Sequence, residues 1–170
     1  MKKVGIALLV LLAVIALAYG LFIHLGGSKP IRVELISSAP SALAGKTFRG
    51  TPQDKRLSET FQSIESLLAL HPGKKMHTIY LVEPAGKLDT MEVFVGLDLP
   101  FAPSDLESMT FSEQKFIRAT VTGSKWVMPG PETVKEKIDA YAKENNLVLS
   151  GVFIDRIVSD SEIQVIAPVK

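Results

Sequence analysis

The chain begins with a long apolar run that contrasts with the mixed pattern after it. Residues 4–25 form a stretch of twenty-two residues without an acidic, lysine or arginine side chain. As a helix they would extend about 33 Å at 1.5 Å per residue, which is enough for a hydrocarbon core of ~30 Å. We therefore predict a transmembrane anchor over 4–25, preceded by a cytoplasmic stub at 1–3.

Charge at the start of the chain predicts the orientation of this anchor. Lys2 and Lys3 precede the apolar run, and the positive-inside bias keeps such an end in the cytoplasm. The alternative is a cleaved signal peptide, since Ala-Leu-Ala at 16–18 has the small-x-small form of a cleavage site. We favour a single-pass anchor in the cytoplasmic (inner) membrane, with residues 26–170 on the extracytoplasmic, periplasmic side.

After a short linker at 26–30, strand and helix periodicities alternate along the chain. Residues 31–35 alternate apolar with charged side chains, as a half-buried strand does. Apolar residues from 57 to 68 instead recur three or four positions apart, as on one helix face. Strands are predicted near 31–35, 43–49, 77–83, 91–99, 115–122, 148–158 and 162–167, and helices near 57–68 and 132–146. The stretch 100–110 is predicted to be a loop or short turn.

The order strand, helix, strand, strand occurs twice in this pattern. At an offset of seventy residues, 92–97 lies over 162–167 and the apolar positions coincide. Two such units would pair into antiparallel sheets with both helices on one side. We therefore predict an α+β domain over 31–170, in which two tandem strand-helix-strand-strand repeats form curved antiparallel sheets around a central groove.

Composition excludes several classes of function. The chain has no cysteine, which excludes a disulfide framework, a thiolate metal centre and a cysteine nucleophile. Residues 26–170 hold 17 basic and 18 acidic side chains, so their balanced charge does not predict a nucleic acid partner.

Sequences that resemble catalytic motifs are incomplete. The run 44–47 resembles the end of a phosphate-binding loop, but Pro40 stands where its first glycine is required. Serine and lysine at 112–115 have the spacing of a hydrolase motif without its companion motifs. His71 and His77 lack further ligands at zinc spacing. We predict no cofactor, no metal and no catalytic residue from these motifs.

Acidic residues at strand ends are the more informative candidates. Asp155 stands between Phe153 and Ile157 on one face of a predicted strand. It is either a solvated residue paired with Arg156 or a lysine, or a carboxylate on the wall of an apolar pocket, where burial raises its pKa. Glu83, at the corresponding end of the first hairpin, has the same two interpretations.

Aromatic residues complete the predicted ligand-binding set. Trp126, the only tryptophan, precedes the second helix of the repeat and is either a core residue or a lid over a pocket. Phe94 and Tyr80 have polar neighbours along their strands, which favours a lined cavity over a filled one. The predicted ligand-binding residues are Asp155, Trp126, Phe153, Phe94, Tyr80 and Glu83.

The second half of the chain resembles a known family. It is similar to the gyrase-inhibitor-like family in four segments. They are the strand at 115–122 with its glycine turn, the helix at 132–146, the stretch 151–158 and the ending 162–170. The family's domain is also the effector-binding domain of AraC-type and multidrug-sensing activators. Here that domain would follow an N-terminal membrane anchor, and no segment could supply the helix-turn-helix domain of the regulators.

The resemblance implies a site as well as a fold. In this family the two repeats form a saddle whose groove takes small, often cationic and aromatic molecules. A glutamate in the penultimate strand, with a tyrosine two residues on, contacts the ligand. These positions correspond to Asp155 and Ile157, so the acid is shorter and the phenol is missing. At these two positions the chain departs from the pattern that goes with the family's usual ligand chemistry, including the hydrolytic activity of some members.

Three functions follow from this sequence. The favoured one is a membrane-anchored extracytoplasmic module that binds a small apolar or cationic molecule in its central groove. The first alternative is an envelope protein-protein interaction module with a filled groove. The second is a hydrolase of the same fold with Asp155 or Glu83 as general base. The lining of the groove distinguishes the first alternative from the others.

Overall fold

The computed structural model describes the backbone of residues 2–170 and the side chains of residues 9–170. Its helices are α1 (Lys2–His24), α2 (Lys55–Leu70) and α3 (Pro131–Glu144). Its strands are β1 (Arg32–Ile36), β2 (Leu43–Gly50), β3 (Met76–Val82), β4 (Met91–Leu97), β5 (Glu107–Met109), β6 (Lys115–Thr122), β7 (Ile154–Ser159) and β8 (Glu162–Val169). The α+β fold class is confirmed.

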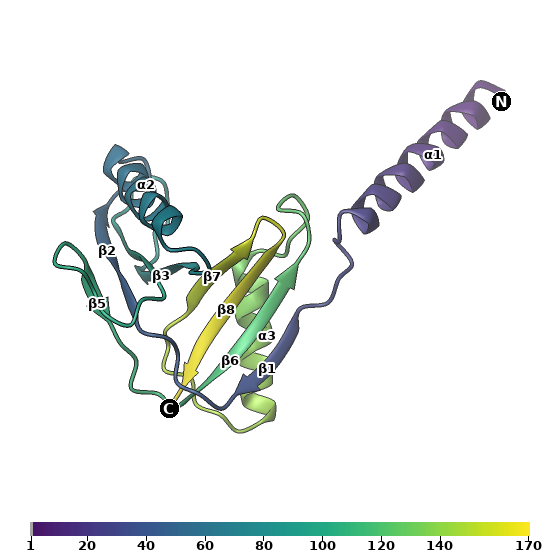
Figure 1. The fold of residues 1–170 in the computed structure, drawn as a ribbon. Helices are drawn as coiled ribbons and strands as arrows, with labels where there is room; N and C mark the ends of the chain where they lie inside the picture. Colours follow the sequence, from purple (N-terminus) through teal and green to yellow (C-terminus); the bar gives the residue numbers. More distant parts are fainter. Residues whose placement is uncertain (1) are drawn as a thin grey trace.

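All eight strands belong to one curved antiparallel sheet in the order β1-β6-β8-β7-β3-β4-β2-β5 (Figure 1). The predicted repeat is present, because β2, α2, β3 and β4 are followed by β6, α3, β7 and β8 in the same order. The two halves are joined where β3 pairs with β7, with Thr78 opposite Asp155. The repeats therefore form a single sheet with its centre at this joint.

Both α2 and α3 pack on the same face of the sheet. Across the joint, register pairs Val95 with Thr78, Thr78 with Asp155, and Asp155 with Val165, so these residues share one face. Val95 belongs to the core beneath α2 and Val165 to the core beneath α3. These two cores lie side by side on the helix face, and the centre of the sheet lies between them.

The opposite face of the sheet carries a third core, which no helix covers. Its buried members include two phenylalanines, Phe94 and Phe116, from different halves. Because successive strand residues point to opposite faces, Phe94 lies on this side while its neighbours in β4 pack beneath α2. Apolar residues of β4 are therefore buried on both faces of the sheet.

Helix α1 extends away from the sheet (Figure 1). Each large apolar side chain from 9 to 25 is at least 38% exposed, and none of these residues belongs to a core of the domain. Its end is attached to the domain by a hydrogen bond of 2.8 Å from the Ser124 amide to the Leu25 carbonyl. The predicted stub at 1–3 and the first residues of the predicted span lie outside the described side chains. Of the residues that the structure describes, no helix meets the length and hydropathy needed to cross a membrane.

The largest difference from the sequence prediction is β5, which lies in the stretch predicted as a loop. Met109 of this strand pairs with Leu43 of β2. A strand of three residues is too short to show a periodicity in the sequence. β5 forms because it pairs with β2. The predicted strand at 148–158 is shorter in the structure, where β7 begins only at Ile154.

We predict that residues 27–170 fold without α1 as a soluble monomer, because all three cores lie within 31–170. The β3–β7 pairing should make both halves unfold together. In a urea titration, amide hydrogen exchange measured by mass spectrometry on peptides of the first half and of the second half should give the same midpoint. Two separate transitions, or aggregation of this shortened chain, would contradict the prediction.

Candidate functional site

The centre of the helix face contains a cavity of about 500 Å³. It lies between α3, the end of β3 and the start of β7. Four of the predicted ligand-binding residues line it: Tyr80, Glu83, Phe153 and Asp155. Residues that are more than seventy positions apart in the chain thus meet at the joint of the two repeats.

Most of the remaining lining is apolar and comes from the second half. β6 and β8 contribute valines and an isoleucine from the floor of the sheet, and the first turn of α3 covers one side. The apolar lining residues outside the predicted set are Pro84, Val121, Pro131, Val134, Ile163 and Val165. An apolar enclosure with a few convergent polar groups is typical of sites for small molecules.

Asp155 is the most perturbed acid of the site. It is the second residue of β7, between Thr78 of β3 and Val165 of β8. Burial raises the pKa of Asp155 to about 6, and this effect exceeds the opposing attraction of the Lys135 charge. The negative charge of Glu83 raises the pKa further. At neutral pH this carboxyl is therefore mostly ionised, but it takes up a proton at a much higher pH than an exposed aspartate does.

Lys135 of α3 is a charged lining residue that sequence reasoning missed. Its ammonium forms an ion pair with Glu83 and lies 3.8 Å from Glu132 Oε1. The same nitrogen lies 5.5 Å from the centroid of the Phe153 ring, which is within the range of a cation–π contact. Burial alone would lower the pKa of Lys135, but the bond and charge of Glu83, with help from Glu132 and Asp155, raise it.

Tyr80 places a phenol at the edge of the same cavity. Burial is the main cause that raises the pKa of Tyr80, and the negative charges of Asp155 and Glu83 add to it. The hydroxyl therefore stays protonated at neutral pH and can donate a hydrogen bond.

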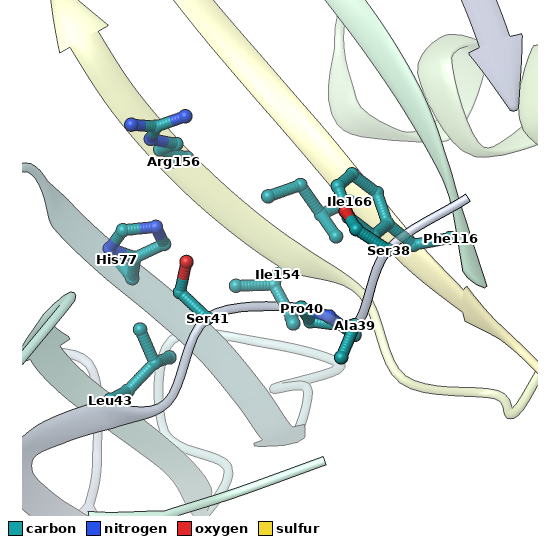
Figure 2. A pocket seen from close by; sticks show the side chains of 10 residues that line it. All are labelled: Ser38, Ala39, Pro40, Ser41, Leu43, His77, Phe116, Ile154, Arg156 and Ile166. Atoms are coloured by element: carbon teal, nitrogen blue, oxygen red, sulfur yellow. The ribbon is translucent and has the colours of Figure 1, made fainter. Parts of the chain in front are cut away.

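Arg156 lies on the opposite face from Asp155, so the ion pair between these neighbours that the sequence allowed is not formed. Figure 2 shows Arg156 beside His77 in a second cavity of about 110 Å³ on the helix-free face. Arg156 Nη1 donates to Gln164 Oε1 over 3.3 Å, and burial lowers the pKa of His77. Asp155 thus faces the large cavity without this counter-charge.

Two predicted ligand-binding residues do not line the large cavity. Phe94 is fully buried in the core of the helix-free face. Trp126 is 80% exposed in the loop before α3, with the Lys125 ammonium 5.3 Å from its ring centroid. Among the residues that the structure describes, no group of histidine, aspartate and glutamate side chains could hold a metal ion.

No family model and no curated protein matches the chain. Several solved structures share its fold. An uncharacterized conserved protein from Listeria innocua has a TM-score of 0.60 at 9% identity, over 82% of this chain and 92% of its own. A hydrolase from Listeria innocua has a TM-score of 0.59 at 8% identity with the same coverage. The C-terminal domain of EcmrR has a TM-score of 0.55 at 11% identity, over 82% of this chain and 98% of that domain.

At such low identities the likeness concerns the fold alone. It agrees with the predicted α+β fold of two strand-helix-strand-strand repeats. The chain therefore has an α+β domain that shares the fold of these solved proteins, with a lined cavity on its helix face.

We predict that Asp155→Asn stabilises the domain in a pH-dependent way. In the folded wild type the pKa of Asp155 lies above the ordinary value of 3.8, so the neutral carboxyl contributes more to the stability of the fold than the carboxylate does. That contribution is complete below about pH 3.8 and is lost as the pH rises through about 6. Asparagine avoids the loss, so the variant should gain about 1–2 kcal/mol in free energy of unfolding at pH 7.5 and almost nothing at pH 4.

Urea titrations of both proteins at several pH values would measure this gain. Asp160→Asn, at an exposed turn after β7, is the matched control and should show no such gain. A loss of stability in Asp155→Asn at pH 7.5 would instead mean that a structural ion pair holds the carboxylate.

Proposed function

We propose that this chain is a membrane-anchored extracytoplasmic module that binds a small apolar or cationic molecule in the cavity on its helix face. The observation that carries the proposal is Asp155, a largely buried acid on the wall of an apolar cavity of about 500 Å³. A carboxylate in such surroundings gains a partner when a cation enters, and the apolar walls bind the rest of the ligand.

The aromatic residues favour a ligand with an apolar body. Phe153 presents a ring beside Asp155, and Tyr80 adds a second ring with a phenol at its tip. Aromatic faces attract cations and pack flat groups at low cost in conformational entropy. Amines with an aromatic or aliphatic body are therefore the class we expect.

The open cavity supports ligand binding over the interaction module with a filled groove. A groove filled by its own side chains would leave no room between α3 and the centre of the sheet, whereas here the side chains of α3 and of the central strands line a cavity of about 500 Å³. A partner protein of the envelope remains the alternative if no small molecule binds.

Hydrolysis is the second candidate, because an acid with a pKa of about 6 can accept a proton near neutral pH. The fold also occurs in a hydrolase. In this proposal Asp155 would be the general base, and Glu83 is less suited because Lys135 pairs with it.

The membrane-anchor part of the proposal rests on the apolar sequence at 4–25. The large apolar side chains from residue 9 to residue 25 are at least 38% exposed and belong to none of the three cores. Exposure of so much apolar surface to water would be unfavourable, whereas a bilayer would cover it. Lys2 and Lys3 precede the apolar run at 4–25, and this charge favours an exported domain.

We predict that a calorimetric screen of aromatic and aliphatic ammonium compounds finds ligands whose affinity depends on Asp155. Asp155→Asn should weaken them about ten- to a hundred-fold, because the desolvated cation loses its charged partner. Trp126→Ala should leave affinity unchanged, since Trp126 is exposed and outside the lining. Equal affinity in wild type and Asp155→Asn would overturn the proposed site, and turnover of a bound ester would favour the hydrolase.

We predict that a reporter fused after Lys170 is active only if it is one that functions outside the cytoplasm. The same fusion should sediment with membranes, and high pH without detergent should not release it. Replacement of Leu11 and Leu12 by arginine should release the protein or block export, because charges at a bilayer centre are costly. A soluble, cytoplasmic fusion in the wild-type sequence would contradict the anchor.

A further inference from the structure

The cavity contains a cation that belongs to the protein itself. We propose that the Lys135 ammonium occupies the position of a ligand's cationic group, so that a cationic ligand must displace it and Lys135 sets the charge preference of the site. This inference rests on the proposed function, because it concerns the same cavity. It adds that a cationic ligand binds in exchange for the Lys135 ammonium, so its affinity includes the cost of displacing that ammonium.

The contacts of Lys135 are those that would hold an ammonium ligand. Its Nζ pairs with Glu83, lies over the Phe153 ring at 5.5 Å, and is close enough to Asp155 for their charges to interact. The side chain is only 22% exposed, although it belongs to a surface helix. A carboxylate and a ring face with a second acid nearby form a complete site for a cation, and Lys135 fills it.

The helix fixes the backbone of Lys135, but its long side chain can rotate. Val134 and Ile138 of α3 are buried in the core beneath the helix, so the backbone at 135 is fixed. The four-carbon side chain of lysine can instead rotate without movement of the helix. Lys135 therefore supplies a cation that can leave while the cavity walls stay in place.

A second acid offers the displaced ammonium a new partner. Glu132 Oε1 lies 3.8 Å from Nζ, one helical turn earlier on α3, and the Glu132 side chain is 78% exposed. Glu132 also lines the cavity, but its side chain is far more exposed than that of Lys135, so a lysine that keeps only Glu132 as a partner would move its charge toward water and away from Glu83. The cost of displacement is then small, since exposed pairs at this spacing are weak but available.

The exchange predicts how charge affects binding. A cationic ligand competes with Lys135 for Glu83 and Asp155, so removal of the lysine charge should strengthen cation binding. An anionic ligand gains the same ammonium as a partner, so that removal should weaken anion binding. A neutral ligand of the same shape should be nearly indifferent.

Three matched probes test this in the full chain, reconstituted in nanodiscs, with empty nanodiscs as the blank. The probes are 2-phenylethylammonium, 2-phenylethanol and 3-phenylpropanoate, which share a phenyl ring on two carbons and differ in the terminal group. Calorimetry at pH 7.5 would give their Kd values for wild type and Lys135→Met, which keeps the length of the side chain without the charge. Lys135→Arg retains the charge, and Lys137→Met removes an exposed lysine of the same helix that lies outside the cavity.

In Lys135→Met we expect the ammonium to bind about tenfold tighter and the carboxylate about tenfold weaker, with the alcohol within about threefold of wild type. Lys135→Arg and Lys137→Met should keep the wild-type order. The same ratio of ammonium to carboxylate affinity in Lys135→Met and wild type would overturn the inference while leaving the ligand site intact. No binding of any probe to Lys135→Met would also overturn it, and the proposed function would fall too if the wider amine screen found no ligand.

Discussion

The pairing of β3 with β7 is the interaction on which the rest of the structure depends. It joins two repeats that each have their own helix and core into one sheet, through a ladder that includes Thr78 opposite Asp155. Because α2 and α3 sit over the outer parts of the helix face, the ladder lies in the gap between them. The cavity is a consequence of this joint, since two helices set that far apart leave the middle of the sheet uncovered.

The joint also explains why a carboxylate can be so strongly perturbed. Strand residues in the middle of a sheet have no exposed backbone edge, and Asp155 has neighbouring strands on both sides. Strand alternation points its side chain to the helix face, into the cavity. There burial raises the pKa of Asp155 by more than the attraction of the Lys135 charge lowers it. The pKa of Asp155 thus depends on Lys135, which belongs to α3. The charge that a ligand meets in the cavity therefore depends on the position of α3.

Alternation and helical spacing predicted the repeat and the order of its helices and strands, but not β5. Four of the six residues predicted to bind a ligand line the cavity. Phe153 and Asp155 share a strand face, and Tyr80 and Glu83 lie near the equivalent end of the first hairpin, so the repeat itself brings them together. Phe94 was predicted to bind a ligand but lies in a core. Both faces of β4 are buried, so the alternation of apolar residues does not say which face lies toward the cavity. Lys135 was missed because its role depends on where α3 sits across the start of β7, which no local pattern encodes.

The cost of burying the Asp155 carboxylate favours a functional role for this residue over a structural one. Among the described residues no hydrogen bond or ion pair within 4 Å holds its carboxylate, and Arg156 points to the other face. An asparagine or an apolar residue at this position would fit the same strand without the cost of burying a charge. Local rules of folding are most often broken at sites of function, and here the buried acid lies on the wall of the apolar cavity on the helix face. The resident ammonium of Lys135 reduces the cost only in part, which leaves the carboxylate able to gain from a better partner.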